Sequence, residues 1–370
     1  MSDEALSEHR TYLADTTRLE CYDRAIRREV RPGDVVLDLG AGTGILGLMA
    51  ARAGAARVYA VEAGPIIAGA RDIARANGYG DSIRHVRGYS TELTLPEPVD
   101  VVVGDQIGGF GYDAGVFAAY ADAARRLAKP EARFVPGTLS LLVAIAELPA
   151  QHAAAEWWSS RPAGFDMSTL RTHESNMPRG VHVSAGHLLS AVIPVVERPS
   201  SDDSPIHVET TVIATRSGTV HGLVGMFSAK LADGAAMSNI PGDASCIDRW
   251  QLYFPFDNPV AIAAGDPVAV KMRINPVSYL ATWEIAVAGT TQRQSTFAGR
   301  FVWADDVQEL RRSTIPSVSE RGSARRTIAS LADGRHTTGS IVEITAQAHP
   351  SLDAATVDRL VYDVLTELGG

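Results

Sequence analysis

A glycine-rich turn lies between a short apolar run and a helical segment near the start of this chain, and it constrains the fold more than any other feature. Residues 38–44 read DLGAGTG and follow the apolar run 35–39. Glycine lets the backbone turn sharply and come close to a ligand at the N-terminus of the next helix. Because glycine also costs backbone entropy, the close spacing of Gly40, Gly42 and Gly44 indicates a ligand-binding turn.

Strands and helices alternate on both sides of this turn. Short apolar runs predict strands, and segments with apolar residues at helical spacing predict helices. The predicted strands are 35–39, 57–61, 83–87 and 99–103, and the predicted helices are 5–29, 45–53, 65–77 and 116–127. This alternation predicts a doubly wound α/β, Rossmann-like domain over residues 1–136.

The pattern changes at Pro136, where a series of short β-like runs begins. They include residues 139–145, 207–214, 223–228, 250–254, 268–274 and 282–288, with turn residues between them. Runs of this length and spacing predict an antiparallel β-barrel or sandwich over residues 137–312. We expect a short helix to interrupt it within residues 151–170.

Three further helices are predicted in a third unit, residues 316–370. They are residues 324–331, 338–348 and 353–368, with Thr338 and Asp353 as N-caps. A three-helix bundle and a winged helix both fit this pattern. A helical tail that packs on the barrel or on a second subunit fits it equally well.

The composition narrows the class of protein. Cys21 and Cys246 are the only cysteines and form no CxxC pair, so we expect neither a metal site nor a disulfide framework. A net charge of −9 argues against a protein that tracks nucleic-acid phosphates. The sequence shows no long apolar run and no secretory signal, so we expect a cytoplasmic protein without a membrane span.

Two kinds of ligand compete for the glycine turn. Residues 42–47 read GTGILG, which matches the G-x-G-x-x-G dinucleotide fingerprint, and Glu62 follows at the end of the second strand. A carboxylate there can accept the hydroxyl protons of a ribose. Asp38 instead suits an ammonium, and Arg18 on the preceding helix can hold a carboxylate. An ammonium and a carboxylate at one end describe an amino acid, which favours S-adenosylmethionine.

From about His9 to residue 302 the sequence resembles the protein arginine methyltransferase family. Residues 9–22 read HRTYLADTTRLECY and are similar to the family's first helix, and residues 36–46 are similar to its cofactor loop. The resemblance implies S-adenosylmethionine as the cofactor, a homodimer, and a front domain joined to a β-barrel. It also implies a cofactor site. There the methionine end contacts His9 and Arg18, and the ribose contacts Glu62. The adenine contacts Ser90 and Thr91.

The acceptor side of the sequence departs from the family. Residues 104–113 read GDQIGGFGYD where the family has a loop, one residue longer, whose two glutamates clamp a guanidinium. Asp105 and Asp113 stand in for those glutamates, and Asp105 is expected to border the cofactor as well. Residues 246–250 read CIDRW and resemble the threonine–histidine–tryptophan loop of the acceptor pocket, with Arg249 in place of the histidine beside Trp250.

Each acceptor residue also has a plainer explanation. Asp105 can cap a loop after its strand, Asp113 can cap a helix that starts at Ala114, and Trp250 can belong to the barrel core. Arg249 can simply pair with its neighbour Asp248. If Arg249 does lie in the acceptor pocket, its charge disfavours a guanidinium and can instead bind a substrate carboxylate.

The sequence therefore predicts an N-methyltransferase of a small-molecule or peptide amine or guanidine, in a specialised bacterial pathway. Aspartate is one methylene shorter than glutamate, so two such changes widen the pocket. One alternative is O-methylation with Asp105 or Asp113 as the base. Another is a binding module that has kept the fold and lost catalysis.

Overall fold

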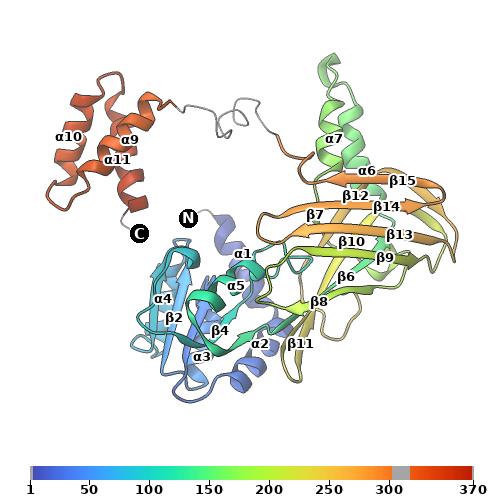
Figure 1. The fold of residues 1–370 in the computed structure, drawn as a ribbon, viewed down its shortest axis with the longest axis horizontal. Coiled ribbons are helices and arrows are strands. Elements are labelled where there is room, and N and C mark those ends of the chain that lie inside the picture. The colour runs from blue at the N-terminus through green and yellow to red at the C-terminus, as the bar shows by residue number, and fades with distance from the viewer. Residues whose placement is uncertain (1–2, 302–316, 369–370) are drawn as a thin grey trace. The chain divides into compact units, whose positions relative to one another are not determined.

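The computed structural model describes residues 3–301 and 317–368 and divides the chain into two compact units, residues 1–300 and 301–370 (Figure 1). The first unit contains both the α/β domain and the β-rich domain, and the second contains three helices. The predicted domain limits at residues 312 and 316 lie outside the described residues. No helix in the described part of the chain is long and apolar enough to cross a bilayer.

A parallel sheet forms the centre of the α/β domain, as predicted, but it has five strands, and the strand over residues 128–135 was not predicted. Its strands follow the order β3-β2-β1-β4-β5. They are β1 (Val35–Leu39), β2 (Arg57–Glu62), β3 (Ile83–Arg87), β4 (Val99–Gly104) and β5 (Ala128–Val135). The order in which strands are added to the sheet reverses between β1 and β4. Ligands of such sheets bind beyond the carboxyl ends of the strands at that point.

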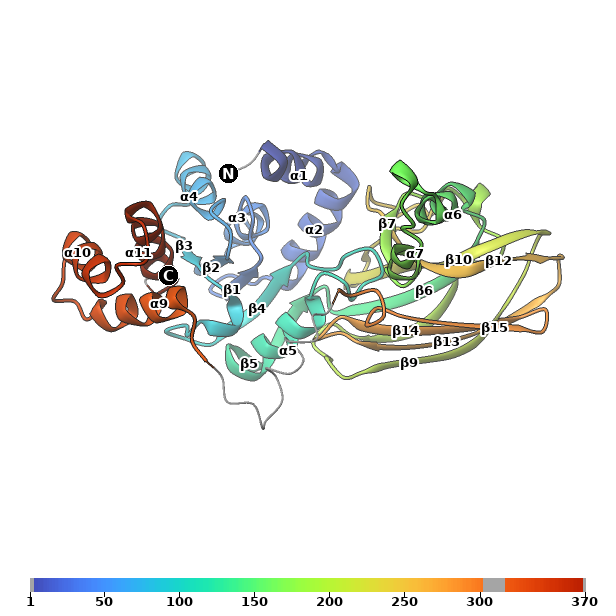
Figure 2. The same ribbon diagram turned by 90° about the horizontal axis from the view of Figure 1, so that it is seen from above.

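Helices cover both faces of this sheet. They are α2 (Thr16–Glu29), α3 (Ile45–Arg52), α4 (Ile67–Ala76) and α5 (Val116–Arg126), and a short 3-10 helix, η1 (Ser90–Glu92), follows β3. Figure 2 shows α3 and α4 on one side of the sheet and α5 on the other. The register of β1 and β4 pairs Leu39 with Gly104, so the glycine turn and Asp105 leave the sheet side by side.

The single helix predicted for residues 5–29 is wrong, because the chain forms two helices there. Helix α1 (Asp3–Ala14) ends one residue before Asp15, and α2 begins one residue after it. The side chain of Asp15 accepts a hydrogen bond of 3.0 Å from the backbone N–H of Arg18. Asp15 is therefore the N-cap of α2, and N-cap residues take a non-helical backbone conformation.

The β-rich domain consists of two antiparallel sheets in a barrel-like arrangement. The first sheet has the order β7-β12-β10-β6-β8, with β11 paired to β10, and the second has the order β15-β14-β13-β9. The first contains β6 (Thr138–Ala146), β7 (Arg179–Val181), β8 (Ile193–Pro199), β10 (Gly218–Ala232), β11 (Ala235–Ser238) and β12 (Gln251–Ile262). The second contains β9 (Ile206–Ile213), β13 (Pro267–Asn275), β14 (Leu280–Val287) and β15 (Thr290–Ser295).

One continuous hydrophobic core joins the two domains of the first unit. Phe110, in the loop after β4, packs edge-on against Phe254 of β12, with ring centroids 5.5 Å apart. Phe254 in turn packs against Trp283 of β14 at 5.3 Å. This row of aromatic rings fixes the loop that carries Asp105 and Asp113 against the β-rich domain, since buried aromatic pairs have preferred geometries.

A helical segment interrupts the β-rich domain between β6 and β7, as predicted, and extends further than expected. It contains α6 (Pro149–Glu156), η2 (Trp157–Ser159), η3 (Pro162–Gly164) and α7 (Thr169–Ser175), and η4 (Ala185–His187) follows β7. Trp157 and Phe165 in this segment are 55% and 67% exposed. Large apolar side chains are thus presented to the surroundings at its tip.

The second unit is a three-helix bundle with its own core. Its helices are α9 (Glu320–Leu331), α10 (Thr338–Ala348) and α11 (Ala354–Leu368). The buried side chains come from all three helices and include Ile328, Ile341 and Leu360. The N-cap predicted at Thr338 is wrong by one residue, because the side chain of Thr337 accepts from the backbone N–H of Ser340.

Candidate functional site

The glycine turn after β1 is held between Glu62 and His9. One carboxylate oxygen of Glu62 accepts a hydrogen bond of 3.1 Å from the N–H of Gly42, and the other accepts one of 2.7 Å from Gly64. Gly42 has a positive φ of 54°, and a Cβ built on it would lie 2.9 Å from Cε1 of His9. The turn is therefore left-handed and closely packed, and only glycine fits at position 42.

Asp38 lies at the end of β1, below this turn. Its Oδ2 accepts a hydrogen bond of 2.8 Å from the N–H of Gly47 in α3, while its Oδ1 is buried and has no partner among the described residues. Burial raises the pKa of Asp38 to about 7, and the hydrogen bond from Gly47 offsets part of that increase. An unpaired buried acceptor of this kind is what a bound ammonium would satisfy.

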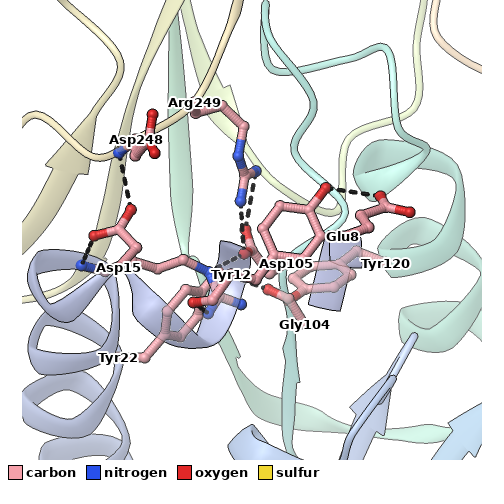
Figure 3. A network of polar contacts seen from close by, with 10 residues as sticks. Glu8, Tyr12, Asp15, Tyr22, Gly104, Asp105, Tyr120, Asp248 and Arg249 are labelled. Atoms are coloured by element: carbon pink, nitrogen blue, oxygen red, sulfur yellow. Dashed lines mark hydrogen bonds and ion pairs between the residues drawn. The ribbon is translucent and has the colours of Figure 1, made fainter. Parts of the chain in front are cut away.

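Three charged side chains meet at the end of β4, although they are far apart in the sequence. Asp105 Oδ2 binds Nε of Arg18 at 2.5 Å and Nη2 of Arg249 at 2.9 Å (Figure 3). Asp105 Oδ1 lies 3.3 Å from Nη1 of Arg249. We call these three residues the Asp105 cluster. It joins α2, the carboxyl end of β4 and the 246–250 loop.

The Asp105 cluster is buried and carries one net positive charge. Burial alone would raise the pKa of Asp105, but the nearby charges of Arg249 and Arg18 lower it overall. Burial would lower the pKa of Arg249, and Asp105 more than offsets this effect. All three groups therefore stay ionised at neutral pH, and the two guanidiniums share one carboxylate.

The structure contradicts the pairing of Arg249 with Asp248. The backbone N–H of Asp248 instead donates to Oδ2 of Asp15 at 2.8 Å. Asp15 thus caps α2 with one oxygen and holds the 246–250 loop with the other (Figure 3). Arg249 lies against Asp105 because this contact fixes the loop that carries it.

Asp113 closes the loop that begins at Asp105. Its carboxylate accepts hydrogen bonds of 2.9 and 2.8 Å from the N–H groups of Gly109 and Phe110. Burial raises the pKa of Asp113, and these two hydrogen bonds oppose the increase. The alternative that Asp113 caps a helix at Ala114 is wrong, because α5 begins at Val116 with Gly115 as its N-cap.

Trp250 packs between two glycines and is half-buried. A Cβ built on Gly109 would lie 2.7 Å from the Trp250 ring, and one built on Gly180 would lie 2.9 Å from it. The sequence alone did not point to Asn239, which is fully buried and donates to the carbonyls of Gly109 and Trp250 at 2.7 and 2.8 Å. Asn239 therefore ties the acid loop to the Trp250 loop.

The sequence also did not single out Tyr12. Its ring lies 5.6 Å from the guanidinium carbon of Arg18 and 5.3 Å from that of Arg249. Its hydroxyl donates to Glu8 at 3.0 Å, and burial raises its pKa to about 12. Cation–π contacts of this kind hold both arginines in place. The signal available in the sequence was an aromatic residue six positions before Arg18.

The residues predicted to contact adenine follow β3, so in the strand order they lie on the opposite side of the glycine turn from Asp105. Ser90 and Thr91 form η1 after β3. Arg126 of α5 donates to the carbonyl of Ser90 at 2.8 Å and to that of Leu93 at 2.8 Å. These contacts fix the backbone of the loop, and neither hydroxyl makes a hydrogen bond within residues 3–301 and 317–368. Among the described residues, His, Cys, Asp and Glu form no group that could hold a metal ion.

Comparison with known proteins places this site in context. The family model of the ribosomal protein L11 methyltransferase (PrmA) matches residues 14–136. An arginine N(omega)-methyltransferase of Streptomyces achromogenes subsp. streptozoticus is 30% identical over 277 residues, covering 71% of this chain and 75% of that protein. Protein arginine N-methyltransferase 1.1 of Arabidopsis thaliana is 29% identical and covers 72% of this chain and 71% of its own length.

A solved structure shares the architecture. It is the Trypanosoma brucei PRMT1 enzyme–prozyme heterotetrameric complex with AdoHcy, with a TM-score of 0.68 and 23% sequence identity. The match covers 78% of this chain and 97% of that one. At this identity the likeness concerns the fold.

A Rossmann-like sheet with this glycine turn, followed by a barrel-like domain, defines an enzyme that transfers methyl groups from S-adenosylmethionine. More narrowly, the chain belongs to the arginine N-methyltransferase family, since the Streptomyces relative matches three quarters of its own length. The dinucleotide alternative for the glycine turn is thereby set aside.

Proposed function

We propose that this enzyme methylates a nitrogen atom, of the amine or guanidine class, in a small molecule or a peptide. The observation that supports the proposal is the Asp105 cluster. It joins Arg18, the residue expected to hold the cofactor, to the 246–250 loop, which carries Arg249 and is expected to line the acceptor pocket. The names of the relatives support nitrogen as the accepting atom.

The residues of the first unit fit S-adenosylmethionine. Nη2 of Arg18 makes no hydrogen bond within the described residues, so it can receive the methionine carboxylate. Oδ1 of Asp38 is a buried acceptor without a donor, which suits the ammonium. Glu62 lies at the end of β2 and would take the ribose hydroxyls, while His9 packs over the turn at Gly42.

The chemistry requires positioning above all. When bound, S-adenosylmethionine supplies an electrophilic methyl group on a positively charged sulfur. The residues of the chain must hold the accepting nitrogen in line with that methyl group, at about 3–3.5 Å, and exclude water. Asp113 is suited to take the proton that nitrogen loses, because burial raises its pKa above that of an ordinary aspartate.

A transfer assay tests the proposal. The full-length enzyme is incubated with S-adenosylmethionine carrying a labelled methyl group and with three sets of acceptors: amines, guanidines and phenols. We expect label in a nitrogen-containing acceptor and none in the phenols. Label only in phenols would support O-methylation with Asp105 or Asp113 as the base. Tight cofactor binding without transfer to any acceptor would support a binding module.

We also propose that the protein is a homodimer. The helical segment between β6 and β7 presents Trp157 and Phe165, which are 55% and 67% exposed. Exposed apolar side chains gathered on one projecting segment are typical of protein–protein contacts. Light scattering of the wild type and of the Trp157→Ser/Phe165→Ser variant tests this. A monomeric wild type would contradict the proposal.

A further inference from the structure

The position of Arg249 bears on which nitrogen this enzyme accepts. Resting on the proposed function, we infer that Arg249 fills the cation position beside Asp105, so that the enzyme accepts an uncharged amine and rejects guanidinium acceptors.

The first step is that both oxygens of Asp105 already face an arginine of this chain. Its Oδ2 already accepts from Nε of Arg18 and Nη2 of Arg249, and its Oδ1 faces Nη1 of Arg249 at 3.3 Å. The two carboxylate oxygens thus face both terminal nitrogens of Arg249, which is the geometry in which a carboxylate binds a guanidinium. A substrate guanidinium would need the same two oxygens.

The second step is that Arg249 cannot easily leave. The residue is 4% exposed, and its Nε is buried with no partner in the part of the chain that the structure describes. The ring of Tyr12 lies over its guanidinium at 5.3 Å. The loop that carries it is held by the hydrogen bond from Asp248 to Asp15. A buried cation with these contacts stays with its carboxylate, because separating the two would leave a buried charge without its partner.

The third step concerns the second acid of the loop. Asp113 is engaged by the N–H groups of Gly109 and Phe110. The charge of Arg249 also reaches Asp113 and lowers its pKa, although burial outweighs this effect. No pair of free carboxylates therefore faces the acceptor, so the two-acid clamp that the family resemblance implied is not formed in this chain.

The consequence for the substrate follows from charge. The Asp105 cluster has two positive groups and one negative group, so a second cation beside it is repelled. The same field lowers the pKa of an amine and favours its uncharged form, which has a lone pair. As the nitrogen–carbon bond forms and the sulfur–carbon bond breaks, S-adenosylhomocysteine is released and the proton on nitrogen passes to Asp113.

The experiment compares wild type with Arg249→Ala, which empties the position, and Arg249→Lys, which keeps the cation. Ethylguanidinium binding is measured by calorimetry with S-adenosylhomocysteine present. We expect at least about 10-fold tighter binding to Arg249→Ala than to wild type or to Arg249→Lys. Transfer to ethylamine and to ethylguanidine is measured in parallel, and wild type is expected to prefer the amine by about 100-fold in kcat/KM.

Controls separate this inference from the proposed function. Arg293→Ala removes an exposed arginine that pairs with Glu284 and should change neither measurement. Affinity for S-adenosylhomocysteine reports folding, and Arg249→Met serves in place of Arg249→Ala should the latter not fold. Efficient transfer to ethylguanidine or L-arginine by wild type would overturn the inference and leave N-methylation standing. Unchanged ethylguanidinium affinity in folded Arg249→Ala would overturn it too. If no variant transfers to nitrogen, the proposed function fails, and the binding comparison still decides the role of Arg249.

Discussion

Replacing Asp105 with asparagine removes the charge at the centre of the site and keeps the shape of the side chain. Arg18 and Arg249 would then lose the carboxylate that each binds, at 2.5 and 2.9 Å. Their side chains are only 7% and 3% exposed, so water cannot take its place. Removing one partner of a buried ion pair costs about 3–5 kcal/mol. We expect a loss of unfolding free energy in this range, because two cations lose their partner together.

Urea unfolding at pH 7, followed by tryptophan fluorescence, measures this loss. Four of the five tryptophans, including Trp250 and Trp283, belong to the first unit, so the signal reports mainly the unit that contains Asp105. Burial would raise the pKa of Asp105, but the charges of Arg249 and Arg18 lower it below its ordinary value of 3.8. The stabilisation is therefore complete above pH 3.8 and is lost as the pH falls through the folded pKa. The difference between wild type and Asp105→Asn should shrink in that range.

A double-mutant cycle with Arg249→Gln tests whether the two residues act as a pair. The double variant should be more stable than the sum of the two single losses predicts, because the single variants leave a buried charge without its partner. A loss below about 1 kcal/mol for Asp105→Asn, the value of an exposed ion pair, would refute the reasoning, and so would strictly additive losses. Affinity for the cofactor should fall as well, because Asp105 also holds Arg18.

Three further predictions concern the surroundings of this cluster. Gly42→Ala should weaken cofactor binding by about 10-fold or more, since the added Cβ would lie 2.9 Å from His9. Gly69→Ala, whose Cβ would meet nothing nearer than 3.9 Å, is the matched control. Equal cofactor affinities of the two variants in a titration would contradict the prediction. Asn239→Ala takes the side-chain partner from the carbonyls of Gly109 and Trp250 and from the N–H of Phe227. We therefore expect about 1–3 kcal/mol of lost stability and slower turnover at unchanged cofactor affinity. Normal turnover would show that Asn239 has no positioning role. Asp38 has a raised pKa of about 7, so the stability of the fold should fall as the pH rises from 3.8 towards 7. A bound ammonium favours the ionised carboxylate, so cofactor binding at pH 6 should release a proton in wild type and none in Asp38→Asn. Calorimetry in two buffers measures this proton release.

Much of the fold could be predicted from local patterns. Four strands of the parallel sheet and the long strands of the second domain follow from apolar runs, because a strand buried on one or both faces needs them. The fifth strand, β5, was missed, since Lys129, Pro130 and Glu131 interrupt its apolar residues. The predicted strand at 35–39 matches β1 residue for residue, and the helix at 338–348 matches α10. The break at Asp15 was missed, since apolar spacing continues through α1 and α2. Only the hydrogen bond from the backbone N–H of Arg18 to the side chain of Asp15 shows where one helix ends and the next begins.

The sequence by itself determined the glycine turn, the strands around it and the family, because these depend on residues close together along the chain. It also singled out Asp105 and Asp113, the two acids of the loop after β4. Only the tertiary structure decided that Arg18, Asp105 and Arg249 meet, since they are separated by 87 and 144 positions in the chain. A buried carboxylate pairs with whichever cation the packing of distant loops brings to it, and Arg249 was brought to Asp105 by the Asp15 contact and not to its neighbour Asp248.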